Sequence, residues 1–577
     1  MHGEYVAFLA AGTVLLLLVA TIARALVGRT HVPLSVVLFL IGIILAAVDE
    51  QIGAHELLER FRLSPGIVLY VFLPSLIFDS AIKLDVRALR RNLVPILTLA
   101  VPGLLVSTFG IALVLAAATP FRLRTALLLG AILSATDPVA VISVFERLGA
   151  PRRLHVLVEG ESLFNDATAL VVSRILAGLL AGGALTADLA LDGLVEFAYV
   201  FSGGLATGAI LGFATGYVLR AVRSDSFVSI SLTTILAYLS FIIAELFLGV
   251  SGVVATVTAG LTFSGWSWMR VSHEVRNYLE YFWHYVAFVA NALIFLLVGL
   301  LVDPISLWEA VPLLVWVIAG MLVSRLVVSY GLISYLGLNV TRFALDLRYQ
   351  TVIYLGGLRG AVAVAIALSL PSFGANTIFL TLVMGAVLFT LLIQGLTIEP
   401  LVHLLGLDRP SPRDRFIRVD SQLAAQRSAL EALPRIARGG RLSSSILERV
   451  EEEYAASVGP LEHELREILE GADSQAEQER MLCLRSLGEE RGRYVELFDD
   501  GHIGETALRE LDFEVSLQLE AVRHGASLDE LHLRSAHRAR LVERLGRVLV
   551  GLPLLGPLAE RHRRRRFAVD YELSWAH

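Results

Sequence analysis

The sequence has little charge, a single cysteine and a single lysine. Of its 577 residues, 18% are charged and 55% are hydrophobic. A soluble globular protein has about a quarter charged residues, so this chain lacks the polar surface needed to cover itself in water. Cys483 has no partner within the chain, which excludes an intrachain disulfide and a cysteine-based metal cluster. Because Lys83 is the only lysine, nearly all the positive charge is carried by arginine.

The chain also lacks the short motifs of common enzymes. No HExxH, GxSxG or Walker motif stands in a suitable context, and no nucleotide-binding fingerprint is present. We therefore expect neither an enzyme nor a bound cofactor, and no nucleic-acid partner.

Long apolar segments fill the first 400 residues. A hydrocarbon core about 30 Å thick needs about 20 mostly apolar helical residues. This rule predicts an all-α polytopic membrane protein with about thirteen transmembrane helices. The first segment is longer than a signal peptide and lacks a small-residue cleavage site, so we interpret it as a spanning helix. The expected spans lie near residues 4–27, 32–48, 65–82, 93–119, 125–146, 155–180, 195–220, 226–247, 249–265, 282–302, 307–336, 348–371 and 375–400.

Arginine and lysine gather in alternate loops. One set of loops holds only Arg60, Arg62, Arg122 and Arg124. Because basic loops stay in the cytoplasm, the other set predicts an outer N-terminus and a cytoplasmic C-terminus in an inner or plasma membrane. The basic residues of that other set are Arg24, Arg29, Lys83, Arg87, Arg90, Arg91, Arg147, Arg152, Arg153, Arg220, Arg223, Arg270, Arg276, Arg342 and Arg348.

Two spans contain segments that cannot form plain helix. In the span 125–146, Pro138 removes a backbone donor and disfavours helical geometry at Asp137. In the span 348–371, three glycines surround Arg359 in the run Gly-Gly-Leu-Arg-Gly. Interruptions at corresponding positions of two halves indicate inverted repeats with a binding site at the midplane, where broken helices cross.

The composition changes after about residue 405. Residues 405–577 alternate charged and apolar positions at helical spacing, which predicts a cytoplasmic α-helical domain, and we consider a regulatory role for it. The basic run Arg563–Arg566 near its end leaves two interpretations open, contact with anionic lipid headgroups and a solvated tail.

Ionisable side chains at bilayer depth are few. Each costs about 2.5–3.5 kcal/mol to insert, so each indicates a functional or structural role. Three acids and two arginines at the predicted breaks and in the adjacent spans leave one negative charge uncompensated, as a monovalent cation site requires. Arg174, near the outer end of its span, is interpreted as a snorkelling side chain. The candidates are Asp79, Asp137, Glu161, Asp166, Arg174, Arg325 and Arg359.

The span 155–180 carries the strongest candidate for the site. Residues four apart share a helix face, so Ser162 lies beside Asp166 and Glu161 beside Asn165. Carboxylate and hydroxyl oxygens are ligands that hard cations favour. Asn165 also fits an interhelical hydrogen bond, and Ser162 a bond to a neighbouring carbonyl.

Helix ends at the breaks carry partial charges near +0.5 and −0.5. Asp137 is suited to neutralise the positive ends and Arg359 the negative ones. Buried Glu161 needs a cation, and Arg325 is the available partner.

Three ordered motifs carry a resemblance to a known family. Thr136-Asp137-Pro138, the run Glu161–Asp166 and the run Gly356–Ala361 resemble signatures of the monovalent cation/proton antiporter-1 family. That family includes prokaryotic NhaP-type exchangers and eukaryotic sodium/hydrogen exchangers, and the resemblance spans roughly residues 5–400.

The resemblance implies an antiporter of Na⁺ and H⁺ that acts as a homodimer. It implies a transmembrane domain over residues 1–404, with a mobile core near 93–180 and 307–400 and a dimerisation scaffold near 4–82 and 195–302. Asp166 would bind Na⁺ and H⁺ in turn, with Ser162, Asp137 and the Thr136 carbonyl completing the ligands.

The resemblance further implies an ion pair between Glu161 and Arg325, with Arg359 and Asp137 at the helix crossing. Asp79 stands where relatives often have glutamate and is a candidate ligand through water. Asn165 precedes Asp166 where electrogenic relatives carry a second aspartate, which favours one proton per cation.

Several alternatives remain open at this level. An antiporter of the same fold for K⁺ or Li⁺ fits the same residues, because selectivity rests on small differences in site geometry. A cation channel or a non-transporting sensor is a different class, but a channel is expected to show a repeated pore loop or rings of charge, and neither is present.

Overall fold

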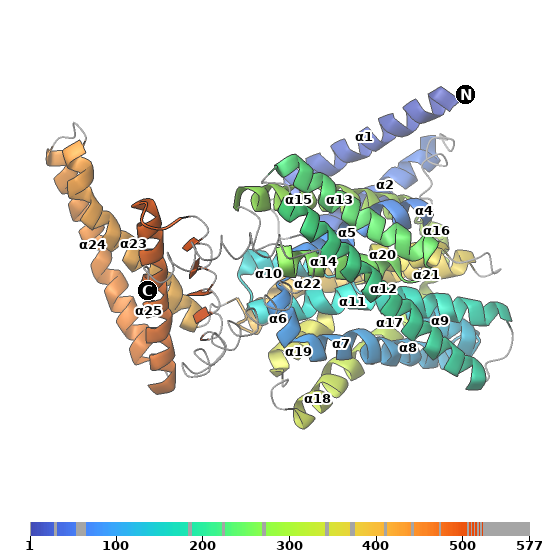
Figure 1. The fold of residues 1–577 in the computed structure, drawn as a ribbon. Coiled ribbons are helices and arrows are strands. Elements are labelled where there is room, and N and C mark those ends of the chain that lie inside the picture. The colour runs from blue at the N-terminus through green and yellow to red at the C-terminus, as the bar shows by residue number, and fades with distance from the viewer. Residues whose placement is uncertain are drawn as a thin grey trace, which may run out of the picture. The chain divides into compact units, whose positions relative to one another are not determined.

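The structure of this chain is a computed structural model. It describes residues 2–27, 32–52, 65–182, 187–221, 225–267, 273–340, 345–369, 376–408, 412–439, 444–471, 475–504 and scattered positions from 507 to 522. The regular elements within these ranges are all helices (Figure 1). The chain divides into two compact units, Met1–Arg409 and Pro410–His577, which are described separately.

The first unit begins with two long helices, and its part up to Phe247 includes three helices of six residues or fewer. Three helical stretches of this part contain a π-helical turn (η1, η2 and η3), in which the chain takes one extra residue per turn. The elements are α1 (His2–Val27), α2 (Leu34–Ile52), α4 (Pro65–Ile67), η1 (Val68–Phe72), α5 (Leu73–Lys83), α6 (Val86–Arg91), α7 (Leu93–Thr98), η2 (Leu99–Gly103), α8 (Leu104–Ala118), α9 (Leu123–Ser134), α10 (Val139–Leu148), α11 (Arg152–Gly182), α12 (Ala187–Ala221), α13 (Ser226–Ile242) and η3 (Ile243–Phe247).

The rest of the first unit repeats these features, with π turns η5 and η7. The elements are α14 (Gly252–Ser267), α15 (His273–Leu300), α16 (Pro304–Glu309), α17 (Val311–Leu326), η5 (Val327–Leu332), α18 (Ile333–Asn339), α19 (Leu347–Leu355), α20 (Ala361–Ser369), α21 (Asn376–Phe389), η7 (Thr390–Gln394) and α22 (Gly395–Leu404).

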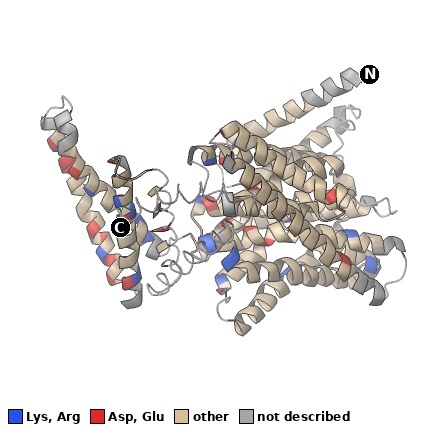
Figure 2. Ribbon diagram, viewed as in Figure 1, with Lys and Arg blue, Asp and Glu red and all other residues tan. Residues whose placement is uncertain are grey.

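Seven helical stretches among the described residues are long and apolar enough to cross a membrane by length and composition alone. α11 is long enough as well, but Glu159, Glu161, Asp166 and Arg174 interrupt its apolar surface. Figure 2 shows how sparse charge is on most helices of this unit. The seven stretches are Leu93–Ala118, Leu123–Leu148, Gly193–Leu219, Ser226–Phe247, Val275–Leu300, Val311–Leu338 and Ile378–Leu404.

Two helical stretches are interrupted where the sequence predicts it. α9 ends at Ser134, since Ala135 is extended at φ −59° and ψ 138°, and α10 starts after Pro138. α19 ends at Leu355, and α20 starts at Ala361. The two interruptions leave four helix ends inside the protein, and each end needs polar partners.

Buried side chains of the first unit form two main clusters. The larger cluster includes the residues around both interruptions and joins α8, α9, α11 and α20. The smaller cluster lies among α5, α13, α14 and α15, where the rings of Phe78 and Trp283 are 4.6 Å apart. The Trp283 Nε1–H donates to Thr233 Oγ1 at 3.2 Å, so the polar atom of this buried ring is satisfied.

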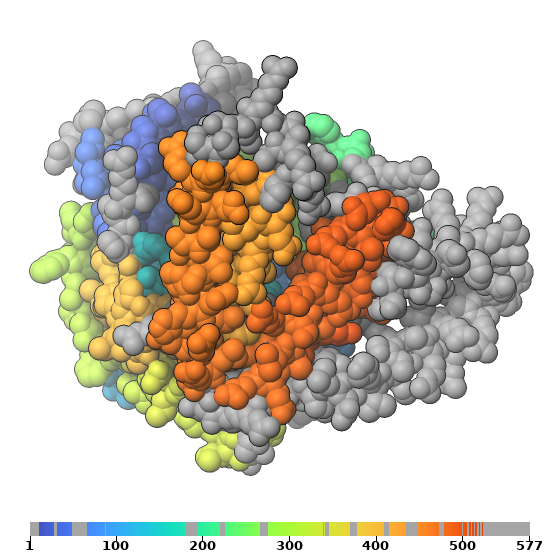
Figure 3. Space-filling view, turned by 90° about the vertical axis from the view of Figure 1, so that its left-hand side faces the viewer, coloured from blue at the N-terminus to red at the C-terminus, as the bar shows by residue number. Residues whose placement is uncertain are grey.

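The second unit contains α23 (Pro412–Gly439), α24 (Ser444–Glu470) and α25 (Gln475–Asp499). α23 packs against both other helices, and Figure 3 shows this unit in space-filling form. Its small core includes Phe416, Leu423 and Met481. Exposed ion pairs join α23 to α24, Arg415 with Glu464 at 2.9 Å and Arg427 with Glu462 at 2.6 Å.

Candidate functional site

The two interrupted helices meet through a backbone hydrogen bond. The Asp137 N–H donates to the Leu358 carbonyl oxygen at 2.8 Å, although 221 positions separate the two residues (358 − 137). The first interruption therefore crosses the second. The glycines allow this approach, because a Cβ atom at Gly360 would overlap the Asp137 side chain and one at Gly357 would lie 2.8 Å from Arg325 Nε.

The Asp137 carboxylate serves the positive ends of both half-helices. It accepts a hydrogen bond from the Val139 N–H at 3.0 Å, at the start of α10. It also accepts from the backbone N–H of Ala361, at the start of α20. One negative charge thus satisfies free donors of two helix N-termini, the arrangement that the helix dipole favours.

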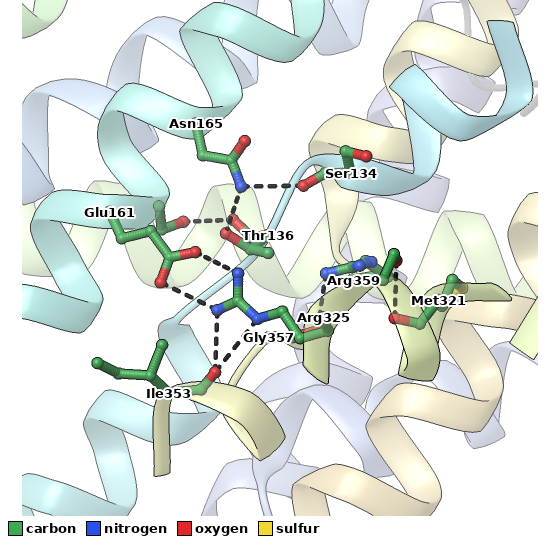
Figure 4. Close-up of polar contacts among 11 residues, drawn as sticks. Ser134, Thr136, Glu161, Asn165, Met321, Arg325, Ile353, Gly357 and Arg359 are labelled. Carbon is green, nitrogen blue, oxygen red and sulfur yellow. Dashed lines mark hydrogen bonds and ion pairs between the residues drawn. The ribbon is translucent and has the colours of Figure 1, made fainter. Parts of the chain in front are cut away.

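The negative end of α9 is satisfied by Asn165. Its side-chain Nδ2 donates to the Ser134 carbonyl at 2.9 Å and to Thr136 Oγ1 at 3.0 Å (Figure 4). The amide nitrogen thus acts as an interhelical donor, the alternative that the sequence left open. The Oδ1 atom is buried and has no hydrogen-bond partner among the described residues.

Arg359 donates a hydrogen bond at the end of α19, not at the end of α9. Its Nη1 donates to the Gly357 carbonyl at 2.8 Å, and its backbone N–H donates to Thr390 Oγ1 at 3.0 Å. Thr390 is a site residue that the sequence analysis missed. The only signal for it was a hydroxyl within an otherwise apolar span.

Asp166 lies in the middle of α11, one turn after Ser162. Its Oδ1 is buried and accepts no hydrogen bond, and no basic side chain of the described part of the chain forms an ion pair with this carboxylate. Asp137 is close enough to interact with it electrostatically. The lone acid expected from the sequence is thus an unpaired carboxylate in the structure.

Two of the expected oxygen ligands, Ser162 and Thr136, are hydrogen-bonded to each other, and Ser162 lies one turn before Asp166 in α11. The Ser162 hydroxyl donates a short hydrogen bond to the Thr136 carbonyl oxygen. Both residues are almost fully buried. Because Ser162 comes from α11 and Thr136 from the interruption, this bond joins the helix of Asp166 to the helix crossing.

Glu161 and Arg325 form a buried ion pair. Arg325 Nη1 and Nη2 donate to the two carboxylate oxygens at 2.5 and 3.0 Å, and the side chains are 8% and 3% exposed for Arg325 and Glu161. The guanidinium also donates to the Ile353 carbonyl at 2.9 Å, near the end of α19 (Figure 4). A bidentate pair of this kind fixes both side chains in place.

Asp79 has a different partner from the one expected. Lys83 Nζ lies 2.6 and 2.7 Å from its two oxygens, and it is also 3.4 Å from His284 Nδ1. The pair is one helical turn apart in α5. A water-mediated contact from Asp79 to an ion remains a hypothesis, and it requires Asp79 to share or release Lys83.

Arg174 forms an ion pair that its interpretation as a snorkelling side chain did not include. Its guanidinium forms an ion pair with Glu245 of η3, a residue absent from the sequence candidates. Glu245 lies near the end of the expected span 226–247, and nothing in the sequence connected it with Arg174.

Comparisons with known proteins show the family to which this chain belongs. Residues 14–404 match the family described as sodium/hydrogen exchanger, transmembrane. The chain is 35% identical to the Na⁺/H⁺ antiporter ApNhaP of Aphanothece halophytica, over 84% of this chain and 92% of that protein. It is 37% identical to the low-affinity Na⁺/H⁺ antiporter NhaS1 of Synechocystis sp. over 72% and 77% of the two chains.

A solved structure shares the fold. The sodium proton antiporter MjNhaP1 of Methanocaldococcus jannaschii superimposes with a TM-score of 0.58 at 19% identity, over 70% of this chain and all of that one. With the sequence match over residues 14–404, we conclude that the chain belongs to the sodium/hydrogen exchanger family.

Proposed function

We propose that this protein is a secondary antiporter that exchanges Na⁺ for H⁺ across the membrane. The observation that carries the proposal is the buried Asp166 Oδ1, which has no hydrogen-bond or ion-pair partner among the described residues. Ser162, one turn before Asp166 in α11, is hydrogen-bonded to the Thr136 carbonyl, and we propose these two neutral oxygens as further ligands. The names of the relatives, Na⁺/H⁺ antiporters, support the same activity.

The mechanism we propose is competition at one carboxylate. Asp166 holds either a proton or a sodium ion, because a buried carboxylate is stable only when its charge is neutralised. The other charges nearby are already engaged, Glu161 by Arg325 and Asp137 by two helix N-termini. The core therefore moves between its two sides of the membrane only when Asp166 holds a proton or a sodium ion.

An exchange of one proton for one sodium ion follows from the same set of charged groups. Asn165 has a neutral amide that does not titrate, so it does not add a second proton-binding group. Its amide nitrogen instead donates to Ser134 and Thr136. We propose that the exchange is electroneutral, and that Asp137 assists the ion through charge while it holds the two helix ends.

We propose that the transmembrane domain has thirteen spans built as two inverted repeats. The core comprises about 93–180 and 307–400, and it contains both interrupted helices. The scaffold comprises about 4–82 and 195–302, and the separate cluster around Trp283 belongs to it. Alternating access then moves the core against the scaffold.

We further propose a homodimer in the inner or plasma membrane, with an outer N-terminus and a cytoplasmic C-terminus. The second unit, with its charged helices α23–α25, would lie in the cytoplasm and regulate transport. The basic run Arg563–Arg566, a candidate contact for anionic lipid, lies outside the described residues.

Reconstitution into proteoliposomes tests the activity. An imposed Na⁺ gradient should drive a pH change inside the vesicles, and a panel of Na⁺, Li⁺ and K⁺ identifies the cation. Clamping the membrane potential at different values should leave the rate unchanged. A response to K⁺ alone would refute Na⁺ exchange, and a rate that follows the potential would refute electroneutrality.

A further inference from the structure

An ion pair between Arg174 and Glu245 joins α11, the helix of the ion site, to the proposed scaffold. Arg174 of α11 lies within the proposed core, and Glu245 of η3 lies within the proposed scaffold. Arg174 Nη1 pairs with Glu245 Oε1. Two other ion pairs of this unit do not join core and scaffold: Glu161–Arg325 connects two core segments, and Asp79–Lys83 lies within one scaffold helix.

Glu245 is held from the scaffold side. Its second oxygen, Oε2, accepts a hydrogen bond from the Gly252 N–H at 3.0 Å, at the first residue of α14. The side chain is only 7% exposed. A carboxylate at a helix N-terminus is favoured by the helix dipole, so Glu245 remains satisfied when its other oxygen is free.

Arg174 is the partner that can leave. Its side chain is 49% exposed, so the protein does not enclose the guanidinium and leaves it room to separate from the carboxylate. An exposed ion pair is worth roughly a twofold to fivefold change in an equilibrium. The contact is therefore strong enough to bias two conformations and weak enough to break in each cycle.

The position along α11 connects this pair to the ion. Arg174 follows Asp166 by eight residues, about 12 Å along the helix axis. At its other end, α11 begins at Arg152, in a loop that the sequence analysis assigns to the cytoplasm. Asp166 thus lies between the Arg174–Glu245 contact and the end that the basic loops assign to the cytoplasm.

We propose that Arg174 and Glu245 form a latch that holds core and scaffold together on the outer side while the site opens to the cytoplasm. The latch must open each time the core presents Asp166 to the outside. This inference rests on the proposed exchange function and on the division into core and scaffold.

Reversible cross-linking tests the latch. Cys483 is first replaced by serine, and Arg174→Cys with Glu245→Cys is joined by a short bifunctional thiol reagent that a reductant cleaves. The matched control is Arg147→Cys with Glu399→Cys, which replaces an Arg–Glu pair within the core. Exchange is measured in proteoliposomes before cross-linking, after cross-linking and after reduction.

The latch predicts that cross-linking 174 to 245 stops exchange, that reduction restores it, and that the cross-linked control stays active. Full exchange by the cross-linked 174–245 protein would overturn the proposal, because the two segments would then not need to separate. Loss of exchange in both cross-linked proteins would also overturn it, because the effect would not be specific to the interface. Failure of the exchange function itself would appear separately, as no exchange in the uncrosslinked protein.

Point variants give a second measurement. Glu245→Gln keeps an acceptor for the Gly252 N–H and removes the charge, and Arg174→Gln removes the charge from the other side. If the pair acts as a latch, each single variant should change the apparent KM for Na⁺ added outside by about twofold to fivefold, and the double variant should match the singles. Additive effects of the two substitutions would show that the residues act independently and would contradict the latch.

Discussion

The Asp137 N–H donates a 2.8 Å hydrogen bond to the carbonyl oxygen of Leu358. This bond joins the interruption between α9 and α10 to the one between α19 and α20, and it brings four helix ends to one place. The Asp137 carboxylate, Asn165 and Arg359 satisfy ends of these half-helices. Asp166 is then the one acid of the ion site that neither satisfies a helix end nor forms an ion pair among the described residues.

The crossing should be sensitive to a single methyl group at Gly360. Gly360→Ala places a Cβ atom against the Asp137 side chain, and over-packing of this kind costs about 1–3 kcal/mol. We expect a lower melting temperature in detergent and a strong loss of exchange. Gly178→Ala is the control, because its Cβ would meet no atom within 4 Å. Equal behaviour of the two variants would contradict the close crossing.

The Glu161–Arg325 pair should matter for folding more than for transport chemistry. Arg325→Met alone leaves Glu161 buried without a cation and should cost about 3–5 kcal/mol. Glu161→Gln together with Arg325→Met removes both charges and should recover much of this loss. Thermal unfolding monitored by size-exclusion chromatography compares the variants. A double variant as unstable as Arg325→Met would argue against a mainly structural ion pair.

Asn165 should act as a donor to the end of α9. Asn165→Leu leaves the buried Ser134 carbonyl without its partner, at a cost of about 1–3 kcal/mol. We expect reduced thermal stability and reduced exchange. Ser143→Ala serves as the control, because that hydroxyl bonds only within its own helix, to the Ala140 carbonyl. Unchanged stability of Asn165→Leu would show that the amide does not hold the helix end.

The sequence predicted the two helix interruptions and the Glu161–Arg325 pair, but not the contact between Arg174 and Glu245. Pro138 and the glycine run mark the interruptions because their backbone chemistry is local. The partner of Glu161 could be identified because few basic residues lie at bilayer depth. Glu245 could not be linked to Arg174, since they are 71 positions apart (245 − 174) and the sequence assigned Glu245 to the end of a span.

The sequence also could not predict the hydrogen-bond and ion-pair partners of Asp79 and Asn165. The spacing of Asp79 and Lys83 suits a helical ion pair, but the expected span ended at residue 82 and left Lys83 in a loop, whereas α5 continues to Lys83. For Asn165 the sequence allowed both an ion ligand and a hydrogen-bond donor. In the structure the amide nitrogen donates to the Ser134 carbonyl while the buried Oδ1 has no partner among the described residues, so the role of Asn165 as an ion ligand stays a prediction.

Competition between Na⁺ and H⁺ should appear in the pH dependence of transport. A protonated carboxyl cannot bind the cation, so the apparent KM for Na⁺ should rise as pH falls, by about tenfold per pH unit once the site is mostly protonated. The maximal rate at saturating Na⁺ should change much less. Initial exchange rates measured over a matrix of pH and Na⁺ concentration check this. A pH effect on the maximal rate alone, with constant KM, would contradict a shared site.

The most direct test of the account is Na⁺-driven proton movement by the Asp166→Asn variant in proteoliposomes. Asparagine keeps the size of the side chain but cannot release a proton or neutralise a cation. The account predicts no exchange above that of empty vesicles, from a variant whose elution profile and melting temperature stay close to those of the native protein. Exchange by this variant at a rate near that of the native protein would contradict the assignment of Asp166 as the shared site.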